Sequence, residues 1–271
     1  MITNINNEFS TLLQLIDYDI DHLRTLNKGY SELDRYQDIK AYNHNIITIN
    51  NNKENYINAS PMNIINDKYF ISTQGPKRET IEDFWTMIDQ YNCNVIIMLC
   101  NEEEGGVEKC VNYWNPNEFD KYILKQVKID EQRDLYIIRE FKLYNKEKKT
   151  EKKIKQIHYI GWPDGGVPET EDGIVFDNFD EIIQLTDKYR GEGPIVVHCS
   201  AGVGRTGSFI SMYLLKKEII SQISDKIETI RFSVFNLVRK LKEMRLYSVQ
   251  TFLQYSFVYQ FVSYLLNKYN I

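Results

Sequence analysis

One segment of the chain constrains the fold more than any other. From Pro194 to Phe209 the sequence reads PIVVHCSAGVGRTGSF, in which a short apolar run leads into a glycine-rich stretch and then into residues with helical spacing. The short apolar run predicts a buried central strand. A strand that passes through a glycine-rich loop into a helix directs several backbone N–H groups toward one point, where an anion binds readily.

Cys199 and Arg205 stand at the two ends of this loop. One turn of loop would bring a thiol and a guanidinium to the same phosphate group. Helix-terminal amides and Arg205 should favour the thiolate, so we predict Cys199 as a nucleophile. The planar fork of Arg205 can bind two phosphoryl oxygens and stabilise their charge. The amide cradle between them would be formed by Ser200, Ala201, Gly202, Val203 and Gly204.

The same residues allow two other interpretations. A cysteine after a strand is more often a small buried hydrophobe, and the Cys-x5-Arg spacing alone is a weak signal. Gly202, Gly204 and Gly207 also spell the GxGxxG pattern of a dinucleotide-binding turn. That turn normally opens a βαβ unit and is followed by an acidic residue after the next strand. Here the pattern comes late, and helical then polar residues follow it, which disfavours a dinucleotide site.

Composition narrows the class of protein. The 271 residues are 42% hydrophobic with 19 Tyr and 13 Phe, enough for one sizeable core, and we expect a single domain over residues 1–271. The formal net charge of −5 disfavours a nucleic-acid partner. No apolar run approaches the length of a membrane span. The four cysteines contain no CxxC pair, so we expect no metal cluster or disulfide framework and favour a reducing, cytoplasmic location.

Apolar periodicity outlines alternating helices and strands. Expected helices cover about Phe9 to Leu23 and residues 80–91, 173–189, 207–221, 229–245 and 251–267. Expected strands cover residues 67–74, 95–99, 121–129, 134–144, 153–160 and 194–198. The charge-rich stretch from Lys146 to Lys155 could be a linker or a basic arm, but the strand patterns on both sides favour an exposed hairpin turn.

Several motifs resemble one enzyme family. HCSAGVGRTG resembles the signature loop of the cysteine-dependent protein tyrosine phosphatases, and WPDGGVP, starting at Trp162, resembles their mobile aspartate loop. Segments similar to the tyrosine-specific branch extend from about residue 34 to 260: DRYQD, NYINAS, YFISTQGP, DFW, KCVNYW and VQTFLQY. The resemblance implies an α/β (α+β) fold with a highly twisted mixed β-sheet flanked by helices. It also implies a monomeric enzyme that acts on phosphotyrosine-containing proteins without a metal or organic cofactor.

The resemblance assigns further catalytic roles. Asp164 matches the general acid that protonates the leaving tyrosyl oxygen, although an isolated Asp after Pro would be a simple turn residue. Gln250 and Gln254 resemble the glutamines that position water for hydrolysis of the phosphocysteine, and Gln250 is the stronger match. Thr206 matches the hydroxyl that donates a hydrogen bond to the departing thiolate.

It also assigns binding and supporting residues. Tyr36 should lie along the substrate ring, and Asp38 should bind the peptide backbone. Glu104 should orient Arg205 and Lys109 should contact the aspartate loop, although both could be ordinary surface charges. Two residues would support the loops: His198, as a structural donor beside the thiolate rather than a general base, and Trp162, as a hinge.

One departure from the family pattern lies next to the chemistry. Gly165 and Gly166 follow Asp164, where the family often has an aromatic residue. We expect weaker cover of the substrate ring and a more mobile open loop.

Two rival functions share the signature loop. A catalytically dead phosphotyrosine-binding module would keep Arg205 and the cradle, but the presence of Cys199, Asp164 and Gln250 argues against it. A dual-specificity or lipid phosphatase would lack the segments that contain Tyr36 and Gln250.

Overall fold

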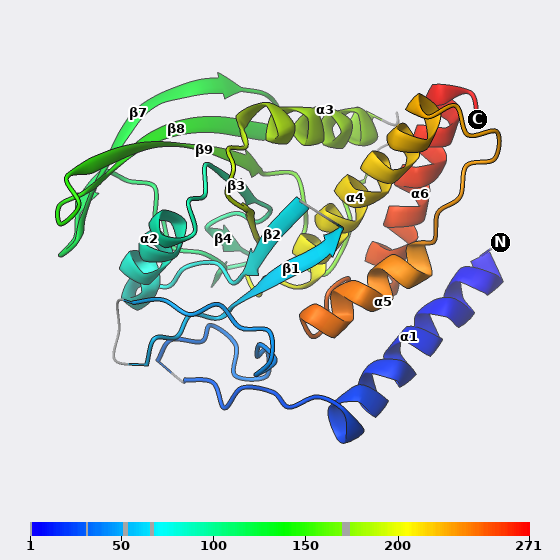
Figure 1. Ribbon diagram of the computed structural model, residues 1–271, viewed down its shortest axis with the longest axis horizontal. Helices are drawn as coiled ribbons and strands as arrows, with labels where there is room; N and C mark the ends of the chain where they lie inside the picture. Colours follow the sequence, from blue (N-terminus) through cyan, green and yellow to red (C-terminus); the bar gives the residue numbers. More distant parts are fainter. Residues whose placement is uncertain (1, 31, 51–53, 66–67, 170–173) are drawn as a thin grey trace.

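The computed structural model describes residues 2–30, 32–50, 54–65, 68–169 and 174–271. Eight strands of these residues form one twisted sheet (Figure 1). They are β1 (Ala59–Ile65), β2 (Lys68–Thr73), β3 (Val95–Met98), β6 (Asn117–Glu118), β7 (Tyr122–Gln132), β8 (Tyr136–Asn145), β9 (Thr150–Tyr159) and β10 (Ile195–His198). A separate hairpin is formed by β4 (Glu103–Glu104) and β5 (Val107–Glu108).

The large sheet has a parallel centre and antiparallel edges. Its spatial order is β1–β2–β10–β3–β9–β8–β7–β6. Strand β10 pairs in parallel with β2 and β3, and β3 pairs in parallel with β9. The outer pairs, β1 with β2 and β9 through β6, are antiparallel. Strands β3 and β10 are buried at every position, as their apolar sequences predict. The predicted mixed sheet is confirmed.

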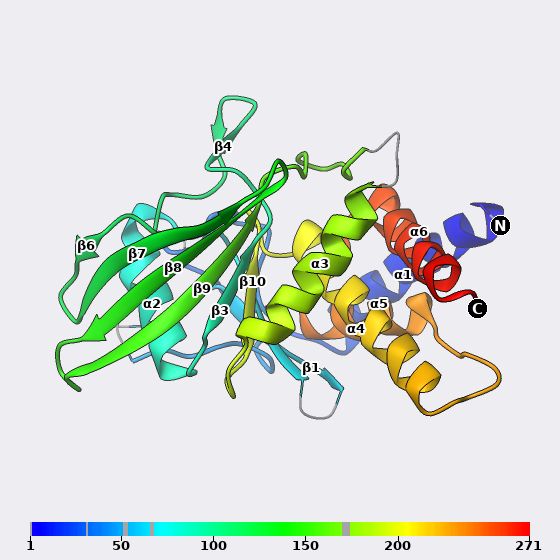
Figure 2. The same cartoon turned by 90° about the horizontal axis from the view of Figure 1, so that it is seen from above.

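Helices cover both faces of this sheet. They are α1 (Ile2–His22), α2 (Ile81–Gln90) with the 3-10 turn η1 (Arg78–Thr80) before it, α3 (Ile174–Tyr189), α4 (Gly204–Ser224), α5 (Val234–Met244) and α6 (Phe252–Tyr269). Helices α3 and α4 lie on one face of the central strands and α2 lies on the other (Figure 2). Among the described residues, no helix is both long and apolar enough to cross a membrane.

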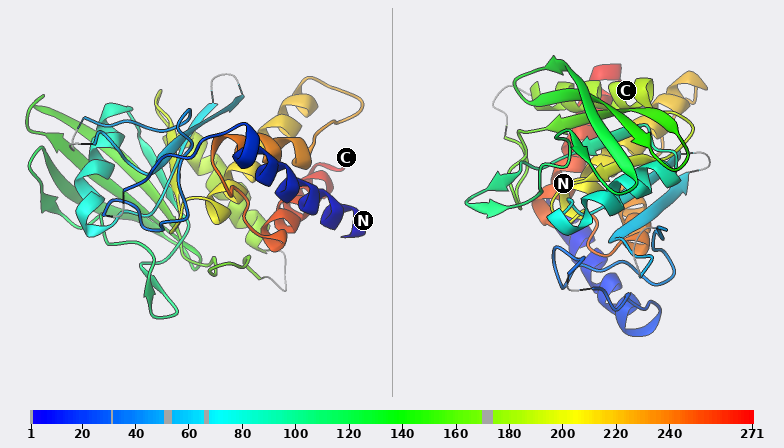
Figure 3. Two further views of the ribbon diagram at one scale, coloured as in Figure 1. Left: turned by 90° about the horizontal axis from the view of Figure 1, so that it is seen from below. Right: turned by 90° about the vertical axis from the view of Figure 1, so that its left-hand side faces the viewer.

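Helix α1 packs against the C-terminal part of the chain. It lies beside α5 and α6, as the view from below shows (Figure 3). The carboxylate of Glu8 accepts hydrogen bonds from the hydroxyls of Tyr255 at 2.8 Å and Tyr259 at 2.6 Å. The ring of Phe9 lies 5.5 Å from that of Tyr255. The first helix is therefore an integral part of the domain.

Most of the predicted elements are confirmed, and their ends show where local sequence was insufficient. The expected segments 67–74 and 173–189 each begin at a residue outside the described ones. Helix α4 begins three residues earlier than predicted, at Gly204. The helix predicted over 229–245 begins only at Val234, because the side chain of Ser233 caps it by accepting a hydrogen bond from the Asn236 amide at 3.1 Å. Strands β1, β4, β5 and β6 were not predicted.

The charge-rich stretch after residue 145 forms the predicted hairpin turn between β8 and β9. The side chain of Asn145 accepts hydrogen bonds from the amides of Glu147 and Lys148 at 3.0 and 2.9 Å. Lys149 has a left-handed backbone with φ of 55°. The linker and basic-arm interpretations are therefore excluded.

Candidate active site

The parallel strands gather the predicted site at one edge of the sheet. The carboxyl ends of β3, β9 and β10 lie side by side, because Met98 pairs with both His198 and His158. The loops that follow these strands carry Glu104, Asp164 and Cys199. Residues far apart in the sequence meet there, which is the usual position of a site in an open parallel sheet.

The loop after β10 has the geometry of an anion cradle. The amide of Gly202 points at the Cys199 sulfur, with an N–Sγ distance of 3.3 Å. Gly202 has a φ of +71°, and a Cβ on it would lie 2.1 Å from the carbonyl oxygen of Thr73. Only glycine fits there, because both the left-handed backbone and the close approach of β2 exclude a side chain.

A buried arginine holds this loop from behind, and the sequence analysis did not identify it. Arg245 donates from Nε to the Gly202 carbonyl at 2.7 Å and from Nη2 to the Ala201 carbonyl at 3.1 Å. Ser72 also donates to the Gly202 carbonyl at 2.8 Å. Carbonyls held outward leave the amides of the same loop turned inward. Burial lowers the pKa of Arg245 to about 10, so the side chain is still a cation at neutral pH.

The guanidinium of Arg205 is fixed by the hairpin loop after β3. Its Nη1 and Nη2 donate to the two carboxylate oxygens of Glu104 at 2.7 and 2.8 Å, a bidentate pair. Nη1 also donates to the carbonyls of Leu99 and Trp162 at 3.1 and 3.0 Å. Burial alone would lower the pKa of Arg205, but the hydrogen bonds to Glu104 raise it. Arg205 is thus a permanent cation in a fixed orientation.

The aspartate loop lies over the cradle. Asp164 accepts hydrogen bonds from Lys109 Nζ at 2.5 Å and from Arg205 Nη2 at 2.9 Å. Burial acts to raise the pKa of Asp164, but the Lys109 hydrogen bond and the positive charge of Arg205 outweigh it and lower the pKa. The carboxyl group predicted as the acid is therefore within reach of the cradle and is ionised before substrate binds.

A pocket of about 230 Å³ opens between these loops. Its lining is formed almost wholly by residues that the sequence singled out: Tyr36, Asp38, Ile39, Lys109, Asp164, Gly165, Cys199, Ser200, Ala201, Gly204, Arg205, Gln250 and Gln254. The other predicted site residues, which are Gly202, Val203, Thr206, Glu104, His198 and Trp162, lie around this lining and support it.

The family model for protein-tyrosine phosphatase matches residues 30–264 of this chain. The chain belongs to the protein-tyrosine phosphatase family. This assignment excludes the dinucleotide-binding interpretation of the glycine-rich loop.

Individual phosphatases are similar over most of the chain. Tyrosine-protein phosphatase non-receptor type 20 of Rattus norvegicus is 35% identical over 96% of this chain and 60% of its own length. The Homo sapiens protein of that name is 36% identical over 88% and 55%. The chain thus spans little more than half the length of these relatives. A solved structure of PTPN18 in complex with HER2 phosphopeptides superposes with a TM-score of 0.85 at 26% identity, covering 96% of this chain and 92% of that one.

Hydrogen bonds fix the walls of the phosphatase pocket. Ser200 Oγ donates to the Lys109 carbonyl at 2.9 Å, so the Tyr36 hydroxyl, 2.9 Å away, is the donor to Ser200. Gln254 is buried and caps α6, because its Oε1 accepts from the amides of Gln250 at 2.9 Å and Thr251 at 3.2 Å. The Gln250 side chain stays exposed at the pocket.

His198 and Thr206 are buried polar residues close to Cys199 in the sequence. Burial lowers the pKa of His198 to about 3, so its ring is neutral. Its Nδ1 lies 3.0 Å from the Cys199 carbonyl and its Nε2 lies 2.7 Å from the hydroxyl of Tyr113. Tyr113 lies within the KCVNYW segment, but no role was predicted for it. The hydroxyl of Thr206 is buried and has no hydrogen-bond partner among the described residues.

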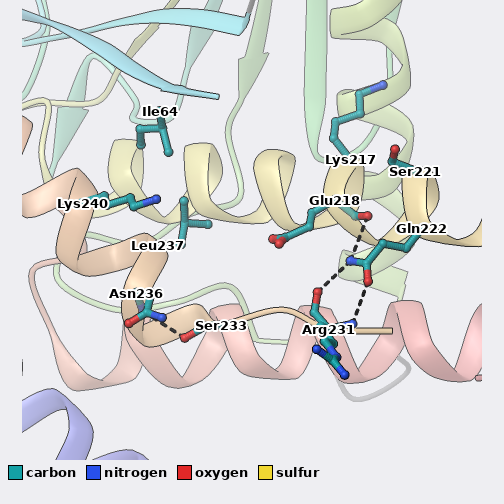
Figure 4. A pocket seen from close by; sticks show the side chains of 10 residues that line it. All are labelled: Ile64, Lys217, Glu218, Ser221, Gln222, Arg231, Ser233, Asn236, Leu237 and Lys240. Carbon is teal, nitrogen blue, oxygen red and sulfur yellow. Dashed lines mark hydrogen bonds between the residues drawn. The ribbon is translucent and has the colours of Figure 1, made fainter. Parts of the chain in front are cut away.

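A larger groove, of about 830 Å³, lies elsewhere on the phosphatase domain. Figure 4 shows it between α4, α5 and Ile64 of β1. There the side chain of Gln222 bonds the backbone of Arg231 through both amide atoms, at 2.7 and 2.8 Å, and so fixes the loop between the two helices. The groove contains neither the predicted nucleophile nor the predicted acid, so its size does not indicate the reaction site.

Proposed function

We propose that this chain hydrolyses phosphotyrosine in proteins in two steps, through a cysteinyl-phosphate intermediate on Cys199. One observation carries the proposal: a single small pocket is lined by Cys199, Arg205, Asp164 and Gln250. These groups are the nucleophile, the charge-stabilising cation, the acid and the water-positioning amide that such a reaction needs.

In the first step the Cys199 thiolate attacks phosphorus, and the S–P bond forms as the P–O bond to the tyrosyl oxygen breaks. The substrate phosphate takes over the Arg205 Nη2 hydrogen bond that Asp164 now accepts at 2.9 Å. The dianion also places negative charge beside the Asp164 carboxylate, which favours its protonated form. Protonated Asp164 then gives its proton to the leaving oxygen, so that neutral tyrosine departs.

In the second step water attacks the phosphocysteine and releases inorganic phosphate and the thiolate. The exposed amide of Gln250 would hold this water, and the anchoring of its backbone through Gln254 supports that role. Asp164, now ionised, accepts the proton from water. The unpartnered hydroxyl of Thr206 supports its assignment as the donor to the departing thiolate, because a buried donor without an acceptor costs stability unless another state supplies one.

The pocket supports tyrosine as the substrate residue. Tyr36 forms a wall of the pocket and is hydrogen-bonded to Ser200 at the cradle, which supports its assignment as the side chain that lies along the substrate ring. We propose further that the protein acts as a cytoplasmic monomer without a metal or a nucleic-acid partner. Its net charge of −5 supports the absence of a nucleic-acid partner, and its four free cysteines support a reducing, cytoplasmic location.

Replacing Cys199 tests the proposal. Cys199→Ser should abolish hydrolysis of a phosphotyrosine peptide yet still bind vanadate, because the amides and Arg205 are unchanged. Cys93→Ser is the matched control, since Cys93 is a buried thiol outside the pocket, and it should keep full turnover. Hydrolysis by the Cys199 variant would refute the nucleophile. An inactive parent protein that still binds phosphopeptide would instead identify a binding module.

A further inference from the structure

A buried row of polar side chains connects the far strands of the sheet to the nucleophile. Arg139 on β8 and Gln156 on β9 are direct partners across the sheet. Arg139 Nη1 donates to Gln156 Oε1 at 2.8 Å, and Gln156 Nε2 donates to the Tyr113 hydroxyl at 2.7 Å. That hydroxyl lies 2.7 Å from His198 Nε2, and His198 Nδ1 lies 3.0 Å from the Cys199 carbonyl.

Every proton in this row has one possible position. A guanidinium can only donate, which fixes the amide of Gln156 with its nitrogen toward Tyr113. Tyr113 therefore accepts from Gln156. At the other end, the Cys199 carbonyl can only accept, so the neutral ring of His198 carries its proton on Nδ1. Its Nε2 is then a bare acceptor 2.7 Å from the Tyr113 hydroxyl, which donates to it rather than to the weaker acceptor Met98 Sδ at 3.9 Å.

A second branch leaves the same guanidinium. Arg139 Nη1 lies 3.2 Å from His158 Nδ1, and His158 Nε2 lies 2.8 Å from the Cys100 carbonyl. Burial, with the charge of Arg139, lowers the pKa of His158 to about 4. The neutral ring thus accepts from Arg139 and donates to Cys100. Cys100 directly follows Leu99, whose carbonyl binds Arg205.

Burial of the Arg139 guanidinium costs folding free energy, which suggests that the side chain has a role. Its side chain is 9% exposed. Burial lowers the pKa of Arg139, and the nearby negative charge of Glu102 offsets this only in part. The face of Trp114 covers it, with 4.8 Å from the guanidinium carbon to the ring centre. A buried cation whose hydrogen-bond partners are neutral is unfavourable, and apolar side chains could fill the same space without that cost.

We propose that Arg139 and Gln156 are positioning residues that orient the signature loop through Tyr113 and His198. The inference rests on the proposed function, because it takes Cys199 as the nucleophile. A peptide unit is planar, so holding the Cys199 carbonyl also fixes the direction of the Ser200 N–H, the first amide of the cradle. The row therefore sets the orientation of the cradle from β9 and β8, which are the second and third strands away from β10.

Two substitutions of Gln156 distinguish two changes to the row. One turns the hydrogen bond of Tyr113 away from His198, and the other only removes the amide of Gln156. In Gln156→Glu the carboxylate fills the same volume but accepts the hydrogen bond that Tyr113 otherwise donates to His198. His198 Nε2 therefore loses its donor. We expect kcat to fall about 10- to 30-fold, with KM within about 3-fold of the parent. That fall corresponds to about 1.4 to 2 kcal/mol, which is in the range for a buried acceptor left without its donor, here His198 Nε2. Gln156→Leu leaves Tyr113 free to donate to His198 and should lower kcat by only about 2- to 5-fold.

Arg139 gives an independent rescue. Arg139→Met removes charge and donors and should lower kcat about 5-fold, whereas Arg139→Lys keeps one cationic donor and should restore at least half of the parent rate. Ile154→Val is the control for stability. It removes one buried methylene from the same strand as Gln156 and should lower Tm without changing kcat.

A measurement on the parent protein needs no variant to fold. In ¹⁵N-histidine-labelled protein, His198 should give the signals of the neutral Nδ1–H tautomer at every pH from about 5 to 9. An Nε2–H tautomer would overturn the inference. So would variants whose kcat falls only in step with Tm, as for Ile154→Val, or a Gln156→Glu protein with unchanged kcat. These outcomes differ from failure of the proposed function, which Cys199→Ser tests alone.

Discussion

Gly165 offers a test in which two effects of known size oppose each other. It follows Asp164, lines the pocket and has a φ of +67°. Apart from its two chain neighbours, none of the described residues has an atom within 4 Å of the position that a Cβ would occupy there. A side chain at this position would have room, but the left-handed backbone conformation there is unfavourable for any residue except glycine. The sequence-based expectation considered only ring cover and loop entropy and has to be revised.

The magnitudes follow for Gly165→Phe. Holding an L-residue in the left-handed region costs about 1–2 kcal/mol, which corresponds to roughly a 5- to 30-fold loss of closed loop. A phenyl ring over the substrate ring would return about 0.5–1.5 kcal/mol, or roughly 2- to 13-fold. For a phosphotyrosine peptide the two nearly cancel, and kcat/KM should be unchanged or modestly lower. A small non-aromatic phosphate ester gains no ring contact and should show the full loss.

The assay is kcat/KM for both substrates in the parent, Gly165→Phe and Gly165→Ala proteins. The alanine variant carries the backbone strain without the ring, so both substrates should lose about equally. Only the phenylalanine variant should raise the preference for the peptide over the ester, by about 2- to 13-fold. An unchanged preference would refute ring cover, and faster turnover of both substrates would refute the strain.

Two further predictions concern the neighbouring loops. Lys109 lowers the pKa of Asp164, and Asp164 acts as an acid only while protonated, so Lys109→Met should let that pKa rise and move the alkaline limb of the kcat/KM profile to higher pH. A shift to lower pH, or none relative to a Lys153→Met surface control, would contradict this role. Gly202→Ala should lower the unfolding free energy by about 2–5 kcal/mol through left-handed strain and collision with Thr73. In urea titrations Gly105→Ala, which has a φ of +59° and open space, should lose only the strain; equal losses would show that the collision is relieved.

The parts of the site that lie in one continuous segment were predictable from the sequence. The strand, glycine loop and helix from Pro194 to Phe209 contain both the proposed nucleophile Cys199 and Arg205, and their geometry follows from local backbone rules. The same holds for Asp164, whose Trp-Pro-Asp context is itself a motif. The ends of the elements were less predictable, because a cap such as Ser233 competes with an apolar pattern that continues on both sides of it.

Residues that act through another chain segment were not predictable in this way. Arg245 reaches the Gly202 carbonyl across 43 positions, and Arg139 reaches Gln156 across 17. Neither position shows a local pattern that distinguishes it from a surface arginine, and both face the interior only because the sheet and α5 bring them there. Their donors bind backbone carbonyls or neutral side chains rather than acids, so pairing of opposite charges in the sequence could not have found them. The residues proposed for the chemistry of the pocket can thus be recognised from local sequence motifs, whereas the rigidity of the pocket depends on contacts that exist only in the folded protein.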